Sequence, residues 1–311
     1  MMRVRGPVPA AGLVAGYAAD ALFGDPRRGH PVALFGRAAA ALERRVWAGS
    51  KTRGIGYAVL CTGLPVALGL AVQAATRHRP ATRFAATALA TWTVLGGRGL
   101  AGEGAAMAEL LDRGDLPAAR LRLSHLCGRD ADGLDSAALA RAATESIAEN
   151  TSDAVVAPLL WGAVAGLPGL LGYRALNTLD AMVGHRSPRH LRFGWATARG
   201  DDLANLVPAR AGALAAVLCA AAAGGRPDQA WRIWRRDGAR HPSPNAGQVE
   251  AAFAGALGVR LGGVNSYHGE TEDRGVLGDG PAPGTEDLRR AVTLSRAVGL
   301  AALILAVGLA R

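Results

Sequence analysis

The stretch E-S-I-A-E-N-T-S-D, residues 145–153, stands directly before a run of 20 uncharged residues, 154–173. If the acidic stretch is helical, Glu145, Glu149 and Asp153 follow one another at four-residue spacing. Successive residues of an α-helix are about 100° apart, so these three carboxylates lie on one face. The sequence therefore predicts a row of acidic side chains that ends against an apolar segment.

This acidic face has two interpretations. Like charges at this spacing repel one another, and a bare carboxylate is costly to bury beside an apolar run. We therefore expect a divalent cation to balance the charges. The alternative is a solvated acidic helix end that pairs loosely with Arg141 and Arg174.

The composition favours a membrane protein. Half of the 311 residues are hydrophobic and 19% are charged, whereas soluble domains carry about 25% charged residues. Alanine and glycine are abundant and aromatic residues are scarce. Small side chains allow helices to pack closely in lipid.

Apolar segments recur along the chain. Residues 54–76 contain no charge over 23 positions, which is the length of a transmembrane helix. After a short arginine-containing link, a second apolar run reaches Gly97, so 54–97 is predicted to form a helical hairpin. Two prolines and four glycines interrupt 154–173, which favours a broken or re-entrant helix. Further segments are expected at 8–23, 203–225 and 297–310.

The predicted fold is therefore all-α: a polytopic membrane protein with five or six membrane segments, at least one of them broken or re-entrant, plus helical polar loops. We expect a single integral-membrane domain over 1–311. The polar segments expected to carry the active site are 24–53, 98–153, 174–202 and 226–290. Similar motifs flank 154–173, and one shared site requires that a nearby segment does not cross the membrane fully.

Several common classes of site are excluded or disfavoured. The formal charge is +10, but Lys51 is the only lysine, so no glycine-rich phosphate loop with a G-K-[ST] ending exists. The formal dinucleotide pattern at Gly97, Gly99 and Gly102 follows a membrane-like helix rather than a strand, which favours helix packing. Basic residues alternate with apolar runs and show no binding module, so nucleic acid is not an expected partner.

Four polar clusters interrupt the apolar chain: Gly24–Arg37, Glu145–Pro158, Arg174–Arg210 and the block H-P-S-P-N-A-G-Q-V-E-A-A-F-A-G-A-L-G-V-R-L-G-G at 241–263. Residues 243–247 are expected to form a turn that starts a helix, with exposed amides suited to an anion.

In this order, the four clusters closely resemble the adenosylcobinamide-phosphate synthase family of cobalamin biosynthesis over nearly the full length. The most specific matches are E-S-I-A-E-N-T-S-D-A-V-V-A-P, N-T-L-D-A-M-V-G-H-R and the 241–263 block. Gln248 departs from the pattern, since an aromatic residue is expected there.

The resemblance implies a multi-pass enzyme of the bacterial inner or plasma membrane. Such an enzyme joins (R)-1-amino-2-propanol, as its O-phosphate, to a propionate carboxyl of adenosylcobyric acid, with ATP as co-substrate and Mg²⁺ as cofactor. The implied partners are this corrinoid, the aminopropanol phosphate, the lipid bilayer and other enzymes of the same pathway.

The acidic and basic residues suit this chemistry. A carboxylate condenses with an amine only after activation, for example as an acyl phosphate. Phosphoryl transfer needs Mg²⁺ and cationic or amide donors for the developing charge, and Mg²⁺ prefers one or two carboxylates together with water and phosphate. The candidate metal ligands are Glu145, Glu149, Asp153 and Asp180, followed by Asp201 and Asp202.

The other candidates follow from the same motifs. Either His30 or His185 is expected to accept the proton of the attacking ammonium, and Arg186 to act beside them on phosphate. The candidate substrate- and phosphate-binding residues are Asp25, Arg37, Asn150, Arg174, Asn177, Ser243, Asn245, Gly247, Glu250 and Arg260. Structural alternatives remain open: Asp25 and Pro26 suit a helix start, and Arg174 and Arg210 suit membrane ends.

Two other functions remain alternatives. Membrane prenyl- or phospho-alcohol transferases also place aspartates and Mg²⁺ above apolar helices, but the aspartate expected one turn after Asp180 is Gly184. A transporter would explain a broken helix and the arginine at 210, but not the large polar loops with acidic clusters.

Overall fold

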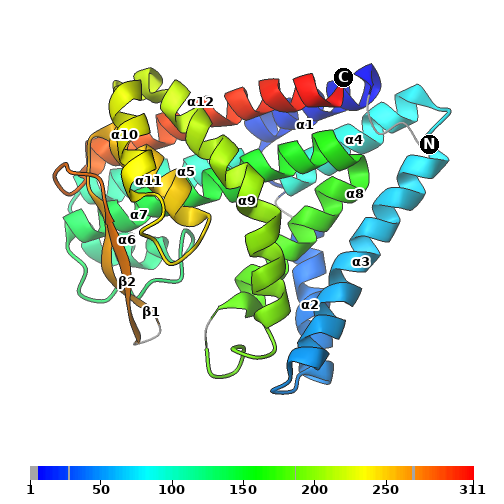
Figure 1. The fold of residues 1–311 in the computed structure, drawn as a ribbon, viewed down its shortest axis with the longest axis horizontal. Coiled ribbons are helices and arrows are strands. Elements are labelled where there is room, and N and C mark those ends of the chain that lie inside the picture. The colour runs from blue at the N-terminus through cyan, green and yellow to red at the C-terminus, as the bar shows by residue number, and fades with distance from the viewer. Residues whose placement is uncertain (1–5, 27–28, 186, 268–269) are drawn as a thin grey trace. The chain divides into compact units, whose positions relative to one another are not determined.

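The computed structural model describes residues 6–26, 29–185, 187–267 and 270–311, and most of them are helical (Figure 1). The elements in chain order are α1 (Pro7–Phe23), α2 (Pro31–Val46), α3 (Lys51–Ala75), α4 (Pro80–Val94), α5 (Gly97–Asp112), α6 (Leu116–Leu123), α7 (Ser136–Thr151), η1 (Ser152–Val156), α8 (Ala157–Leu179), η2 (Asp180–Gly184), α9 (Trp195–Leu218), η3 (Ala220–Ala223), α10 (Pro227–Asp237), α11 (Ala246–Leu257), β1 (Leu261–Tyr267), β2 (Glu270–Leu277) and α12 (Thr285–Ala310). Here η1 and η2 are π-helical turns and η3 is a 3₁₀ turn.

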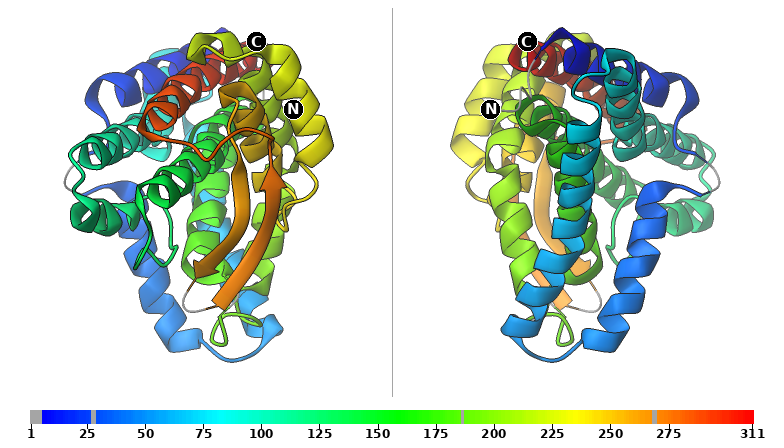
Figure 2. Two further views of the ribbon diagram at one scale, coloured as in Figure 1. Left: turned by 90° about the vertical axis from the view of Figure 1, so that its left-hand side faces the viewer. Right: turned by 90° about the vertical axis from the view of Figure 1, so that its right-hand side faces the viewer.

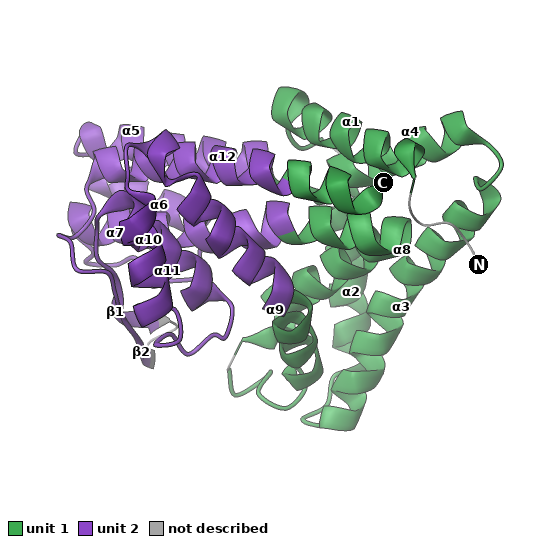
Figure 3. Cartoon of the chain, turned by 45° about the horizontal axis from the view of Figure 1, so that its top comes forward, with its two compact units in different colours: residues 1–96, 157–205, 303–311 green, residues 97–156, 206–302 purple. Residues whose placement is uncertain are grey.

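The chain divides into two compact units (Figure 3). Unit 1 contains residues 1–96, 157–205 and 303–311, and unit 2 contains residues 97–156 and 206–302. The single integral-membrane domain expected over 1–311 stays a prediction.

In unit 1, small residues bring helices into close contact. A Cβ atom on Gly16 of α1 would lie 2.4 Å from Cβ of Thr91, and a Cβ atom on Gly69 of α3 would lie 2.6 Å from the backbone nitrogen of Pro168. Thus α4 packs mainly on α1 and α3 mainly on α8. Residues 54–97 do form two helices, but the predicted hairpin pairing between them is wrong, because each helix has its main partner elsewhere.

The interruption expected within 154–173 is confirmed at Gly166. This residue has φ 68° and ψ −145°, a conformation that glycine adopts readily. A Cβ on Gly169 would lie 2.2 Å from the carbonyl oxygen of Trp161, whereas residues eight apart in a straight helix are about 12 Å apart. The chain therefore turns back at Gly166, and the side chain of Gln73 accepts the Leu167 amide hydrogen bond (3.3 Å).

Three helical stretches among the described residues are long and apolar enough to cross a membrane: Lys51–Ala75, Ser136–Gly184 and Thr285–Ala310. The first exposes a row of large apolar side chains, and burying these in lipid would remove them from water: Val59, Leu60, Leu64, Leu68 and Leu70. These features are those of a helical membrane protein.

The number of crossings predicted from the sequence, five or six, is not confirmed. Helix α9 covers most of the predicted 203–225 segment and is not among the three stretches, because Asp201, Asp202 and Arg210 fall within it. Helix α1 is apolar but shorter, with 17 residues.

Unit 2 contains a feature that an all-α fold does not include. Strands β1 and β2 form an antiparallel hairpin, with Leu261 opposite Leu277 and Val264 opposite Asp273 (Figure 2). The register shifts between Gly262 and Val264, and Gly262 (φ 75°) and Gly263 (φ 82°) supply the left-handed backbone at this irregularity. The prediction of a polar loop over 226–290 missed this hairpin and α10, whereas α11 begins at Ala246, within the turn where a helix start was expected.

The contact between α1 and α4 can be tested with matched glycine substitutions. We expect Gly16→Ala to lower the stability of the purified protein by about 1–3 kcal/mol, because the added methyl would overlap Thr91 and the Ala88 carbonyl. Gly63→Ala in α3 meets no atom within 4 Å and should be neutral or stabilising, since alanine favours helix more than glycine does. Thermal unfolding in detergent measures both, and equal melting temperatures for the two variants would contradict the packing described.

Candidate functional site

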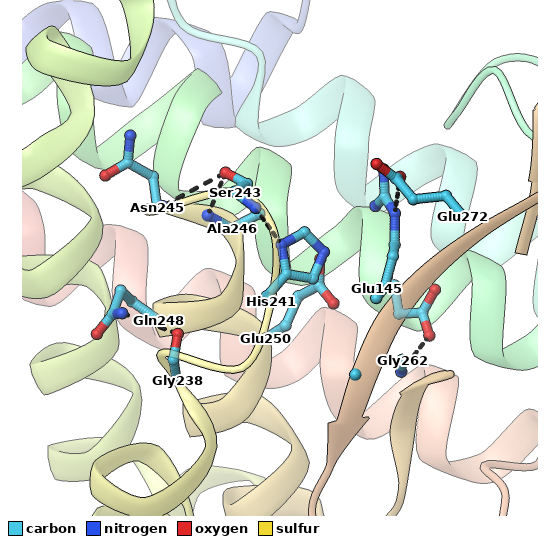
Figure 4. A network of polar contacts seen from close by, with 12 residues as sticks. Glu145, Gly238, His241, Ser243, Asn245, Ala246, Gln248, Glu250, Gly262 and Glu272 are labelled. Carbon is cyan, nitrogen blue, oxygen red and sulfur yellow. Dashed lines mark hydrogen bonds and ion pairs between the residues drawn. The ribbon is translucent and has the colours of Figure 1, made fainter. Parts of the chain in front are cut away.

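Unit 2 encloses a cluster of buried polar side chains (Figure 4). Glu145 comes from α7, Glu250 from α11 and Asn265 from β1. Arg129 lies in the segment before α7, and His241 in the segment before α11. All five are buried, and a buried polar cluster of this size needs internal partners.

The negative charge of Glu145 is balanced by other groups of unit 2. Its Oε2 accepts a hydrogen bond from Arg129 Nη2 at 2.5 Å, and its Oε1 accepts one from the Gly262 amide at 2.7 Å. Arg141, one turn earlier on α7, approaches to 3.9 Å. The interpretation of this position as a solvated helix end is therefore wrong. Arg141 is a partner as expected, but Arg129, the closer one, was missed because it precedes the helix at no helical spacing.

The acidic face does not continue as regular α-helix to Asp153. Glu149 follows Glu145 on α7 and interacts electrostatically with Arg274 and Arg129. Helix α7 ends at Thr151, and Asp153 lies in the π-turn η1. Asp153 therefore does not follow Glu149 at the 100° per residue of a regular α-helix. Single π-turns within helices occur frequently at functional sites.

Asp180 and Asp201 belong to unit 1. Asp180 opens the second π-turn, η2, where a Cβ on Gly184 would lie 1.7 Å from its carboxylate. The glycine found where a transferase motif expects an aspartate thus makes room for the Asp180 side chain. Asp201 accepts hydrogen bonds from Asn177 (3.3 Å) and from Asn205 (3.0 Å).

Asp202 pairs with Arg199 at 3.3 Å on the same helix. Within the described ranges, no group of three or more His, Cys, Asp or Glu side chains is arranged to hold a metal ion. The six metal-ligand assignments stay predictions.

His185 lies in a second network of unit 1. Its Nε2 is 3.2 Å from Nδ1 of His190, whose Nε2 is 3.1 Å from Oε1 of Glu43. Arg189 also donates to Oε1 of Glu43, at 3.1 Å. Partial burial opposes ionisation of Glu43, but the hydrogen bonds from His190 and Arg189 hold the pKa of this carboxyl below its usual value. Sequence reasoning missed Glu43 and His190, which are 147 positions apart in the chain.

Several predicted residues have local structural contacts. His30 begins α2: its Nδ1 accepts the Val32 amide (3.2 Å), and its Nε2 is 3.6 Å from Asp25. Asn150 donates to the Ser146 carbonyl on its own helix at 2.9 Å. Arg37 is exposed, and Arg174 is half-buried in α8. Arg186 lies outside the described residues.

The backbone amides of the turn at 243–247 were expected to be exposed, but two of them are already hydrogen-bonded. Oγ of Ser243 accepts hydrogen bonds from the amides of Asn245 (3.3 Å) and Ala246 (3.2 Å), so these donors are already engaged. Asn245 is buried. A Cβ on Gly247 would lie 2.4 Å from Cβ of His241, so glycine here allows the histidine to pack against α11.

Arg260 is exposed and, together with Arg141, lines a cavity of about 240 Å³. The backbone of Gly262 lines the same cavity, and its amide donates a hydrogen bond to Glu145. Two guanidinium groups beside a cavity of this size are suited to an anionic group.

Burial disfavours the charged forms of both Glu250 and His241. Burial raises the pKa of the Glu250 carboxyl well above its usual value, and the neighbouring Glu145 and Glu149 raise it further. Burial and then the charge of Arg274 lower the pKa of His241 to about 4. The candidate phosphate-binding role of Glu250 is disfavoured by these neighbouring carboxylates, which repel anions.

Acid should destabilise the protein through His241. Its pKa of about 4 in the folded chain lies below the reference value of 6.5, so the folded state binds fewer protons between these values. The stability contributed by the neutral ring is complete above about pH 6.5 and is lost as the pH falls towards 4, by about 3 kcal/mol.

His241→Asn should therefore lose less stability than the wild type between pH 7 and pH 4.5. Asparagine can still accept the hydrogen bond that the Ser243 amide donates to Nδ1 of His241 (2.9 Å). Thermal unfolding at stepped pH measures the difference, and His78→Asn, at an exposed position, is the control. Identical pH dependence in wild type and His241→Asn would contradict the assignment.

Comparison with known proteins agrees with the motifs. The family model described as CobD/Cbib protein matches residues 13–295. The cobalamin biosynthesis protein CobD of Mycobacterium tuberculosis (strain ATCC 25618 / H37Rv) is 56% identical over 299 residues, covering 96% of this chain and 95% of that protein. The proteins of the same name from Geobacter metallireducens and Rhodobacter capsulatus are 47% identical over 265 residues and 42% identical over 311 residues.

The Geobacter match covers 84% of this chain and 83% of the relative, and the Rhodobacter match covers 96% of each. No solved structure matches the chain significantly. The family model and the relatives span nearly the whole chain, including both π-turns and the cluster of unit 2. The chain therefore belongs to the CobD/Cbib family and has a role in cobalamin biosynthesis.

Proposed function

We propose that the chain is a multi-pass enzyme of the bacterial inner or plasma membrane that forms an amide bond with ATP. It attaches (R)-1-amino-2-propanol, as its O-phosphate, to a propionate carboxyl of adenosylcobyric acid, and the product is adenosylcobinamide phosphate. The support is membership of the CobD/Cbib family together with one structural observation. That observation is the buried cluster of unit 2, which places carboxyl groups beside guanidinium groups.

The chemistry explains why such a cluster is useful. A propionate oxygen attacks the terminal phosphorus of ATP, ADP leaves, and an acyl phosphate forms. The ammonium then loses a proton to a base, and the free amine attacks the acyl carbon as phosphate leaves. Negative charge develops in both steps, and Arg129, Arg141 and Arg274 supply cationic groups in unit 2. Because the cluster is shielded from water, these charges act more strongly on a bound substrate.

Mg²⁺ would neutralise the transferring phosphates when bound. Glu145 already has a guanidinium and an amide as partners, so it is the poorer candidate ligand. Glu149, Asp153 and Asp180 stay candidates, because Mg²⁺ takes one or two carboxylates and completes its shell with water and phosphate. The carboxylates of the chain therefore suit a bound Mg²⁺ ion.

The proposed reaction predicts a defined product. Purified wild-type protein supplied with adenosylcobyric acid, aminopropanol phosphate, ATP and Mg²⁺ should yield adenosylcobinamide phosphate, detected by mass spectrometry, and chelation of Mg²⁺ should stop the reaction. We expect Glu149→Gln to reduce the rate by at least about 100-fold, because it removes a charge from the cluster. The matched control is Glu109→Gln, at an exposed position in α5 of the same unit.

The alternatives give different results in the same assay. A transporter would leave adenosylcobyric acid chemically unchanged, and a prenyl- or phospho-alcohol transferase would not consume it. If adenosylcobyric acid is not consumed, or if Glu149→Gln is as active as wild type, the proposal is wrong.

The π-turn aspartates give a second test. Asp153→Ala and Asp180→Ala should abolish turnover and leave membrane insertion intact, because neither carboxylate contributes to apolar burial. Carbonate extraction and size-exclusion chromatography measure insertion and folding, and Asp228→Ala, an exposed residue of α10, is the control. Near-wild-type activity of both variants would remove these residues from the site.

A further inference from the structure

Glu250 presents a buried carboxyl group that has no hydrogen-bond partner within the described part of the chain. Its exposure is 0%, and neither Oε1 nor Oε2 has a hydrogen-bonding partner among the described residues. His241 Nε2 is 3.9 Å from Oε1, which is too far for a hydrogen bond. Native proteins leave few buried carboxyl oxygens in this state, so each one calls for an explanation.

His241 offers an unused donor next to this carboxyl. Nδ1 of the ring accepts a hydrogen bond from the Ser243 amide at 2.9 Å, so the hydrogen of the neutral ring is on Nε2. Nε2 is buried and also lacks a hydrogen-bond partner among the residues that the structure describes. Figure 4 shows the ring beside the Glu250 carboxyl. The two side chains therefore offer one N–H donor and two oxygen acceptors, side by side.

The nearby cations are already paired. Arg129, from the segment before α7, binds Glu145 at 2.5 Å, and Arg274 on β2 is 3.1 Å from Glu272. Glu145 and Glu149, from α7, add negative charge around Glu250. A carboxylate in these surroundings is stabilised by a new cation and destabilised by an anion.

We propose that Glu250 and His241 recognise the amino alcohol end of the substrate, an inference that rests on the proposed function. The Glu250 carboxylate accepts hydrogen bonds from the substrate ammonium group, and Nε2–H of His241 donates to the oxygen on the adjacent carbon. The nitrogen and oxygen of a vicinal amino alcohol lie roughly 3 Å apart when gauche, given standard bond lengths. That spacing lets both atoms contact a donor and an acceptor 3.9 Å apart.

An ammonium group fits these atoms better than a metal ion does. The hydrogen on Nε2 faces the site and repels a metal, and no three-ligand group was found within the described part of the chain. A phosphate group is also a poor occupant, because three carboxyl groups surround the position. The phosphate of the same substrate is better placed near guanidinium groups.

Binding without turnover tests the assignment. The probes are (R)-1-amino-2-propanol O-phosphate and isopropyl phosphate, which lacks the amine; their affinities for the purified full-length protein in detergent are measured by calorimetry without ATP. We expect the wild type to bind the amine at least about 30-fold more tightly, because a charged hydrogen bond in a buried site has that effect. Glu250→Gln should reduce this preference to less than about 3-fold and leave the affinity for isopropyl phosphate unchanged.

Two further variants separate amine recognition from a general loss of structure. Glu250→Asp keeps the charge and should retain part of the preference, whereas Glu109→Gln should retain all of it. His241→Asn should weaken both probes by the same factor. If Glu250→Gln does not fold, the comparison of Glu250→Asp with wild type replaces it, and an unchanged preference in that variant counts against the assignment.

The outcomes also separate this inference from the proposed function. If wild-type protein makes adenosylcobinamide phosphate but Glu250→Gln keeps the amine preference, the inference fails and the proposed function stands. A buried water molecule between Glu250 and His241 would give that result. If wild-type protein binds both probes equally, or binds neither, the recognition site is refuted; absence of product in the separate turnover assay would refute the proposed function.

Discussion

The cluster of unit 2 depends on the contact between Glu145 and its two donors. The carboxylate joins three parts of the chain: the segment before α7 through Arg129, α7 itself, and the β-hairpin through the Gly262 amide. Removing one partner of a buried ion pair costs about 3–5 kcal/mol, because the other charge is then left without compensation. The left-handed backbone at Gly262 and Gly263 bends the strand at this contact. Helix and hairpin are therefore fixed relative to each other within the unit.

Next to this contact lie Glu250 and His241, whose buried polar atoms lack some of their hydrogen-bond partners among the described residues. Burial raises the pKa of Glu250 and lowers the pKa of His241, so in each side chain it disfavours the charged form, which is the costly one to bury. The ion pair of Glu145 and Arg129 adds no net charge to the cluster. Unit 2 thus combines a stable paired centre with adjacent groups that retain hydrogen-bonding capacity, which is the arrangement expected of a binding site rather than of a packed apolar core.

Sequence patterns predicted the helices well, because apolar runs and helix starts depend on neighbouring residues. The break in 154–173 was predictable from Pro168 and the glycines, and Gly166 carries it. The β-hairpin was missed because Gly262, Gly263 and Gly275 obscure the strand alternation. The site could be predicted only in part. Glu145 and Glu250 were named, but their role depends on Arg129 and Arg274, which come from distant segments, and no local spacing connects them.

The reversal at Gly166 has a consequence for how the chain's topology is counted. A segment that turns back within its own length returns towards the side from which it came, so it adds an apolar stretch without adding a passage through lipid. The 49 residues from Ser136 to Gly184 would extend roughly 74 Å as one straight rod, more than twice the thickness of a bilayer's hydrocarbon interior. A scheme that counts this run as one straight crossing and a scheme that counts it as a re-entrant segment therefore place every loop that follows on opposite sides of the membrane.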